Sequence, residues 1–134
     1  MNWTLEVVLV PVSDVDRSKS FYADQLGFNI DHDTVLSDAV RVVQLTPPGS
    51  GCSIVISEGL GEGMVPGSLK GVQLVVADIH KARAQLLEHG VEVGEVTKLG
   101  ESPVAGHELD NVGFVFFDDP DGNSWAVQQI SNRG

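Results

Sequence analysis

The stretch FDDPDGNSWAVQ at residues 117–128 decides the fold of this chain, and an apolar run lies on each side of its central turn. Pro120 fixes its own φ, and Gly122 permits a positive φ. The carboxylates of Asp119 and Asp121 suit hydrogen bonds from nearby backbone amides in turns of this kind. The stretch therefore predicts a β-hairpin with a chemically specified turn.

The second strand of this hairpin has two faces, because successive residues of a strand point to opposite sides of the sheet. Ala126 and Gln128 share one face, which lines any cavity that the sheet encloses. Trp125 and Val127 take the other face. We expect Trp125 to pack beneath a helix, and stacking on a ligand is the alternative.

Length, charge and cysteine content bound the class of protein. With 134 residues the chain fits one domain, which we place over residues 1–134. The formal net charge of −11 repels phosphate backbones and anionic membrane surfaces, so we expect neither nucleic acid nor membrane as a partner. The lone Cys52 excludes an internal disulfide, and no apolar run is long enough to span a membrane. We expect a cytoplasmic protein.

The first half of the chain predicts a strand, a helix and three further strands. Leu5 to Val12 is a β-rich run, and its Pro11 favours a sheet edge or a bulge, because proline donates no ladder hydrogen bond. Asp14 is the expected cap of a helix that stops at Gly27. The three further strands are expected at residues 28–33, 39–46 and 53–57.

The second half repeats this order. Residues 72–79 match residues 8–15, and the helix caps Asp14 and Asp78 lie 64 residues apart. A strand at 91–96 and the terminal hairpin complete the copy. A repeat of this length indicates two copies of one supersecondary module. We therefore expect a first module at 5–58, a glycine-rich linker at 59–70 and a second module at 71–130.

Three features together resemble the vicinal oxygen chelate superfamily of glyoxalases, bleomycin-resistance proteins and extradiol dioxygenases. They are VSDVDRSKSFY at 12–22 with LGF at 26–28, the module repeat, and DPDGN at 119–123. The resemblance implies an α+β fold, in which two βαβββ modules form a curled mixed sheet around a cavity. It also implies a small-molecule ligand or substrate and a homodimer.

The same resemblance implies where metal ligands stand, on the first and last strand of each module. Those positions are Val7, Gly71 and Ala126 in this chain, with Ser53, Val55 or Ser57 on the last strand of the first module. Valine, glycine and alanine offer no donor atom to a cation. We therefore expect no metal and no other cofactor.

Without a metal, the inner wall of the implied cavity is apolar with two amides. Alternation and the family positions select the substrate-binding candidates, which are Val7, Leu9, Val55, Gln73, Ala126, Gln128 and, as the stacking alternative, Trp125. We expect a protein that binds a small apolar or aromatic molecule in the cavity between the modules. Such a protein would sequester a drug or metabolite, as the bleomycin-resistance branch does.

Catalysis is the alternative, and the sequence leaves open whether the chain is an enzyme. His107, Glu108 and Asp110 gather an imidazole and two carboxylates in the loop before the hairpin. Such a set suits a general base held by a carboxylate, or an unconventional metal site. The enzyme would then be a lyase or isomerase of the glyoxalase kind, or a relative of the dioxygenases. A solvated polar loop and a dimeric scaffold without a ligand are the remaining interpretations.

Overall fold

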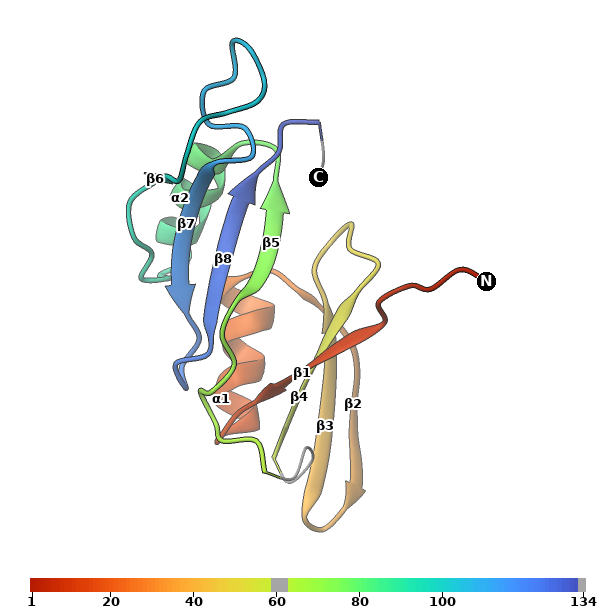
Figure 1. The fold of residues 1–134 in the computed structure, drawn as a ribbon. Coiled ribbons are helices and arrows are strands. Elements are labelled where there is room, and N and C mark those ends of the chain that lie inside the picture. Colours follow the sequence, from red (N-terminus) through yellow and green to blue (C-terminus); the bar gives the residue numbers. More distant parts are fainter. Residues whose placement is uncertain (59–62, 133–134) are drawn as a thin grey trace. The chain divides into compact units, whose positions relative to one another are not determined.

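The computed structural model describes residues 1–58 and 63–132 of the chain (Figure 1). The chain divides into two compact units, the first formed by Met1–Leu69 with Asp119–Asn123 and the second by Lys70–Asp118 with Ser124–Gly134. Part of the expected glycine-rich linker, residues 59–62, lies outside the described residues. Within the described ranges, no helix has the length and apolar character needed to cross a membrane.

The first unit holds a four-stranded mixed sheet. Its elements are β1 (Val7–Pro11), α1 (Val15–Ser20), the π-helix η1 (Phe21–Gln25), β2 (Asn29–Ser37), β3 (Val40–Thr46) and β4 (Ser53–Glu58). The strand order is β1-β4-β3-β2, with β1 parallel to β4 and the other pairs antiparallel. β1 is thus an edge strand, and it ends at Pro11. A sheet edge was one of the two positions that this proline predicted, the other being a bulge.

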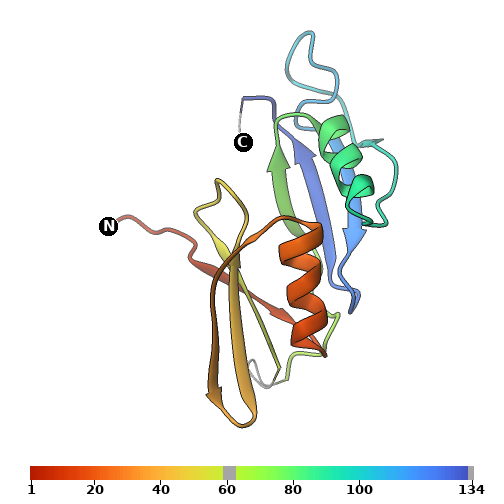
Figure 2. The same ribbon diagram turned by 180° about the vertical axis from the view of Figure 1, so that it is seen from behind.

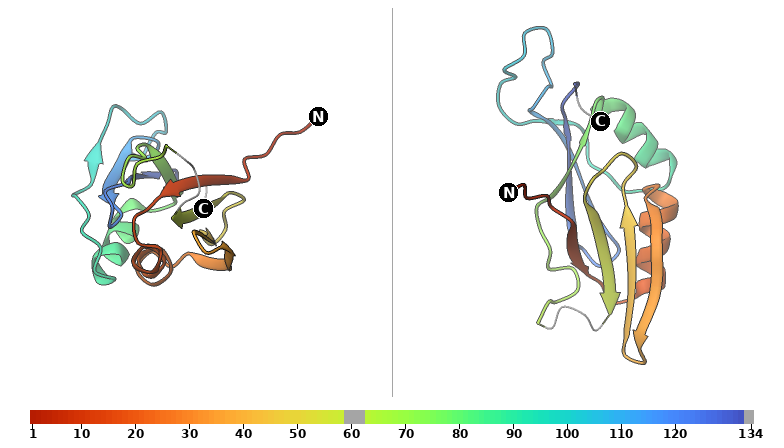
Figure 3. Two further views of the ribbon diagram at one scale, coloured as in Figure 1. Left: turned by 90° about the horizontal axis from the view of Figure 1, so that it is seen from below. Right: turned by 90° about the vertical axis from the view of Figure 1, so that its right-hand side faces the viewer.

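The predicted start and stop signals set the first helix. A carboxylate oxygen of Asp14 accepts the N–H of Arg17 at 3.1 Å, which is the expected N-cap. The helical segment ends before Gly27, whose φ of +78° lies in the left-handed region. α1 lies on one side of its sheet (Figure 3), and the fully buried side chains of this unit include Val10, Val43, Leu45 and Ile56.

Ion pairs identify the sheet face that α1 covers. Arg41 of β3 meets Asp16 of α1 at 2.7 Å, and Lys19 of α1 meets Asp33 of β2 at 2.8 Å. Arg41 also pairs with Asp33 at 2.7 Å. The hydrogen bonds from Arg41 and Lys19 hold the pKa of the Asp33 carboxyl well below its usual range. We call the opposite face, which α1 does not cover, the open face of the first sheet.

The second unit repeats the order of strands and main helix, but β6 has two residues where β2 has nine. It contains β5 (Val72–Val76), α2 (Ile79–Glu88), β6 (Thr97–Lys98), β7 (Gly113–Asp118) and β8 (Ser124–Gln129), in the sheet order β5-β8-β7-β6. Asp78 caps α2 by accepting the N–H groups of His80 and Lys81, and α2 lies against one face of the sheet (Figure 2). Neither sheet closes on itself. Together the two mixed sheets confirm the expected α+β fold, and β7 with β8 confirms the expected hairpin.

The strand predicted at residues 91–96 is wrong. Only β6, two residues long, forms beside β7, and Val93 makes a single bridge to Phe117. The carbonyl of Gly94 accepts the Nε–H of Arg83 from α2 at 2.9 Å instead of a ladder partner. Val91 is 3% exposed, so the alternating valines of this segment reflect packing as well as strand pairing.

The turn at Asp119–Asn123 belongs to the first unit, and its polar side chains are buried there. Asp119 accepts the backbone N–H groups of Asp121 and Asn123 at 3.0 and 2.9 Å. Asn123 donates its Nδ2–H to the carbonyl of Pro11 at 2.8 Å and accepts the N–H of Leu69 at 3.0 Å. These bonds account for the specific residue types of the turn, because each side chain satisfies a defined backbone group.

Candidate functional site

The helix-free face of the second sheet carries a row of side chains fixed by strand register. Phe116 lies opposite Ala126, and Gln73 lies opposite Ala126 from the other side. The next row holds Phe114, Gln128 and Val75 in the same way. We call these six residues the open face of the second sheet. Ala126 has the smallest side chain of the six and stands between Phe116 and Gln73, and we call its position the floor of this face.

The two phenylalanines make one side of this floor. Their ring centroids lie 6.0 Å apart and their planes differ by 7°. Phe116 is 46% exposed, which is a high fraction for a large apolar side chain of a sheet. Neither ring was among the expected site residues. The alternation that assigned faces to Ala126 and Gln128 was available for this strand too, and it places Phe114 and Phe116 together.

A chain of amides makes the other side of the floor. Gln128 donates an Nε2–H to the backbone carbonyl of Asn111 at 2.7 Å. Its Oε1 accepts an Nε2–H of Gln73 at 2.6 Å. The structure thus brings together Gln73, Ala126 and Gln128, three of the expected substrate-binding residues, on one face of one sheet.

Trp125 lies on the other face of the second sheet. It is 2% exposed, and its ring stacks on Phe117 with centroids 6.2 Å apart and planes within 4°. Val127 is 3% exposed on the same face. Trp125 therefore packs in the core of the second unit, as the favoured interpretation expected, and it points away from Ala126.

On the first sheet, the remaining candidates share the open face. The register places Val7 beside Ser53 and Leu9 beside Val55. Val7 is 42% exposed, whereas Val55 is 8% exposed. These apolar side chains therefore form one strip across β1 and β4.

A polar cluster that the sequence did not predict lies on the first sheet. The hydroxyl of Thr46 bonds the carboxylate of Asp31 and, at 2.6 Å, the hydroxyl of Ser53. A register shift in β2 between Ile30 and His32 sets the direction of Asp31. Simple alternation does not anticipate such a bulge, so this cluster had no clear signal in the sequence.

The residues at the family's metal positions do not fit a metal. Val7, Gly71 and Ala126 have no donor atoms in their side chains. Throughout residues 1–58 and 63–132, no group of three or more histidine, cysteine, aspartate or glutamate side chains is placed to hold a metal ion. The side chains at these positions therefore offer a ligand apolar contact and no metal coordination.

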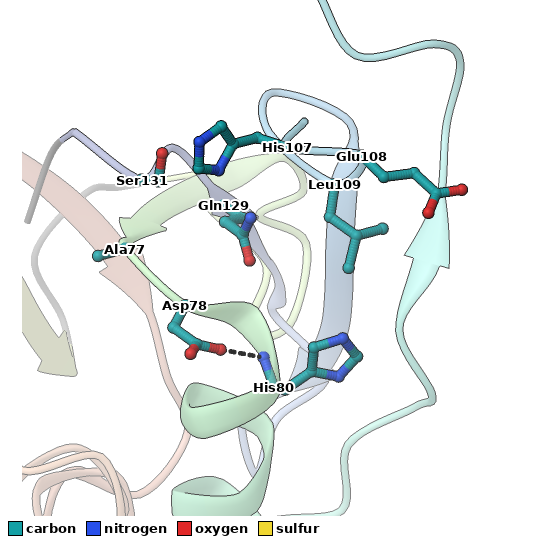
Figure 4. A pocket seen from close by; sticks show the side chains of 8 residues that line it. All are labelled: Ala77, Asp78, His80, His107, Glu108, Leu109, Gln129 and Ser131. Atoms are coloured by element: carbon teal, nitrogen blue, oxygen red, sulfur yellow. Dashed lines mark hydrogen bonds between the residues drawn. The ribbon is translucent and has the colours of Figure 1, made fainter. Parts of the chain in front are cut away.

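The loop before β7 forms an open cleft of about 390 Å³ at one end of the second unit (Figure 4). Its lining residues are Ala77, Asp78, His80, His107, Glu108, Leu109, Gln129 and Ser131. The carboxylate of Glu108 points away from the ring of His107 in Figure 4 and pairs with Lys98 at 3.2 Å. Two of the three catalytic candidates therefore line this cleft, but they do not face each other.

Asp110, the third catalytic candidate, is 3% exposed and ties the loop to the end of β8. Gln129 donates its Nε2–H to Oδ1 at 2.8 Å, and the Ser131 hydroxyl bonds Oδ2. The bonds from Ser131 and Gln129 hold the pKa of the Asp110 carboxyl below its usual value. Asp110 therefore bonds the end of the loop, next to Asn111, to the residues at the end of β8.

Comparison with known proteins agrees with this architecture. The model of the Glyoxalase/Bleomycin resistance protein/Dioxygenase superfamily matches residues 4–127. No curated protein sequence matches the chain. The superfamily match spans both sheets and the hairpin turn.

Solved structures give the same result. TnmS3, an antibiotic binding protein from Streptomyces sp. CB03234, is 30% identical with a TM-score of 0.80, over 97% of this chain and 98% of its own. A glyoxalase/bleomycin resistance protein from the same organism is 30% identical with a TM-score of 0.76, over 94% of this chain and 100% of its own. A superfamily member from Sphaerobacter thermophilus DSM 20745 is 25% identical with a TM-score of 0.77, over 96% of this chain and 98% of its own.

Proposed function

We propose that this chain, which belongs to the Glyoxalase/Bleomycin resistance protein/Dioxygenase superfamily, binds a small apolar or aromatic molecule without using a metal. The observation that carries the proposal is the floor at Ala126, flanked by the exposed ring of Phe116 and the amide of Gln73. The similarity to TnmS3, described as an antibiotic binding protein, supports a binding role.

The chemistry of the floor suits a flat ligand. Covering apolar surface is favourable by about 25 cal/mol per Å², and stacking on an aromatic ring adds roughly 0.5–1.5 kcal/mol. The rings of Phe114 and Phe116 are nearly parallel, so one planar ligand can contact both rings. The small side chain of Ala126 leaves room for the ligand, while the amides limit its orientation.

Sequestration is the activity that follows from this chemistry. On the open face of the second sheet the six residues supply rings, methyl groups and amides, and none of them ionises near neutral pH. A face of that kind holds a molecule but offers no general acid, base or nucleophile.

The homodimer implied by the family resemblance stays a prediction, which sedimentation equilibrium tests.

A pair of tryptophan variants tests the proposed face. 2-Naphthol serves as the probe, and its binding is followed by isothermal titration calorimetry. We expect Ala126→Trp to lower the affinity by roughly tenfold or more, because the indole fills the floor. Ala84→Trp is the matched control, since Ala84 is an exposed residue of α2, and it should bind like the parent protein.

Circular dichroism and thermal unfolding show whether both tryptophan variants keep the fold. Undiminished affinity in a folded Ala126→Trp protein would contradict the assignment of this face.

A catalytic role for His107 is the second candidate, because its imidazole and that of His80 line one cleft. We propose that, if the chain turns over a substrate, His107 is its general base. The test is a screen for turnover followed by the variant His107→Ala. Turnover that persists unchanged in this variant would remove His107 from the reaction.

A further inference from the structure

We infer that the amide chain from Asn111 through Gln128 to Gln73 makes the binding face select aromatic ligands that carry a hydrogen-bond donor, such as a phenolic hydroxyl. This inference rests on the proposed function and gives it a ligand class. It follows from the direction in which each amide of the chain must point.

The direction is fixed at the backbone end. The carbonyl of Asn111 can only accept a hydrogen bond, so Gln128 must turn its NH₂ group toward it. The Oε1 of Gln128 then faces Gln73, which must answer with its own NH₂ group at 2.6 Å. The Oε1 of Gln73 is then the one acceptor of the two glutamine amides that these bonds do not use.

The backbone anchor is held in place from two sides. Asn111 has a φ of +67°, in the left-handed region that non-glycine residues seldom adopt. Its N–H donates to the carbonyl of Gln129 at 2.8 Å. The neighbouring Asp110 accepts hydrogen bonds from Gln129 and Ser131. Asp110 is thus a positioning residue for the amide chain, because it orders the segment that supplies the anchoring carbonyl.

The exposed acceptor favours ligands that carry a hydrogen-bond donor over ligands that do not. Gln73 is exposed, so its Oε1 is hydrated before a ligand arrives. A ligand that covers this oxygen with a hydroxyl replaces the bond to water, whereas one that covers it with a methyl group leaves it unpaired. Gln73 lies opposite Ala126 in the sheet register, so we infer that a ring substituent of a ligand bound over Ala126 can reach this acceptor.

Two probes that share a naphthalene ring and differ at one substituent test this selection. 2-Naphthol carries a hydroxyl, and 2-methoxynaphthalene carries a methyl ether that can only accept. The affinity ratio of the two probes is measured in the parent protein, in Gln73→Leu and in the control Gln85→Leu. Gln85 is an exposed residue of α2, so its substitution repeats the chemical change away from the face.

We expect the ratio to favour 2-naphthol about fivefold more in the parent protein than in Gln73→Leu, as one net hydrogen bond predicts. Gln85→Leu should keep the parent ratio. Gln128→Leu should lower the ratio as well, because Gln73 loses the partner that directs its amide.

The possible outcomes separate the two proposals. Equal ratios in the parent protein and in Gln73→Leu, with both probes bound, would overturn the inference and leave the binding function standing. A parent ratio shifted toward the ether would overturn it too, since Gln73 would then be donating. Binding of neither probe would overturn the binding function, and the inference with it.

Discussion

Tyr22 donates its phenolic hydrogen to Oδ2 of Asp119 at 2.6 Å, although 97 residues separate the two in the sequence. Both residues are buried in the first unit, and Tyr22 is fully buried. Asp119 also holds the backbone of its own turn through two N–H groups. Asp119, which holds the hairpin turn, is therefore bonded to η1, in the first helical segment of the chain.

The substitution Tyr22→Phe should lower the free energy of unfolding by about 1 kcal/mol, because it removes one buried hydrogen bond while Asp119 keeps its bonds to Asn123. The remaining ring still packs near Phe28, whose centroid lies 5.9 Å away. Urea unfolding followed by fluorescence measures the change. Asp119→Ala should cost more, since it leaves several donors without their acceptor, and a neutral Tyr22→Phe would show that the bond adds nothing to stability.

Gly67 is a second sensitive position in the first unit. A Cβ atom there would lie 2.1 Å from the carbonyl oxygen of Asp121, and the φ of Gly67 is +82°. We expect Gly67→Ala to cost about 2 kcal/mol or more, because the backbone has to move apart and the alanine takes a left-handed conformation.

Gly49→Ala provides the matched control for Gly67→Ala. Gly49 has nearly the same φ, +83°, but no atom within 4 Å of the added Cβ. Its cost should be only the conformational one, about 1 kcal/mol. Thermal unfolding measures the stability of both variants. If Gly67→Ala and Gly49→Ala lost the same stability, the close approach of Gly67 to Asp121 would contribute nothing.

The lowered pKa of Asp33 predicts a loss of stability in acid. Hydrogen bonds from Arg41 and Lys19 favour the ionised form, so the folded pKa lies below the ordinary value of 3.8. The contribution, about 1 kcal/mol for partly exposed pairs, is present above that ordinary value and is lost as pH falls through the folded pKa.

Asp33→Asn tests this pH dependence. The variant should be less stable at neutral pH, and the difference from the parent protein should shrink as the solution is acidified. Asp24→Asn, a change at an exposed carboxylate, serves as the control. A constant difference between Asp33→Asn and the parent across the acid range would contradict the assignment.

The composition of the metal positions predicts that metal removal has no effect. Val7, Gly71 and Ala126 provide no ligands, so protein purified without chelators should hold no stoichiometric metal. Its thermal midpoint and its affinity for 2-naphthol should stay the same after dialysis against EDTA. One tightly held nickel, zinc, iron or manganese ion per chain, found by elemental analysis, would refute the metal-free proposal.

The sequence predicted features that depend on neighbouring residues. The caps at Asp14 and Asp78, the edge position of the strand that contains Pro11 and the terminal hairpin each follow from local chemistry, and each is present. Alternation in β8 separated Trp125 from its neighbours correctly, because a strand with one buried face keeps its period of two.

Features that depend on residues distant in the chain could not be predicted from the sequence. The valines at 91–96 suggested a strand, but the carbonyl of Gly94 is taken by Arg83 from the preceding helix. The bonds of Asp110 to Gln129 and Ser131 were not predicted, because they need the end of β8 to be in place, and its catalytic role stays a prediction. Such partners are set by tertiary structure, which no local pattern of residues reports.

The turn at Asp119–Asn123 has a consequence for how this protein can change. Its side chains form hydrogen bonds with Tyr22, Pro11, Leu69 and the turn itself. The stretch of sequence that most clearly indicates the family therefore stabilises the fold. Gln73, Phe116 and Ala126 lie on a separate sheet face, and none of them takes part in that network. Substitutions at these three positions should therefore change the proposed ligand preference without breaking the hydrogen bonds that hold the turn.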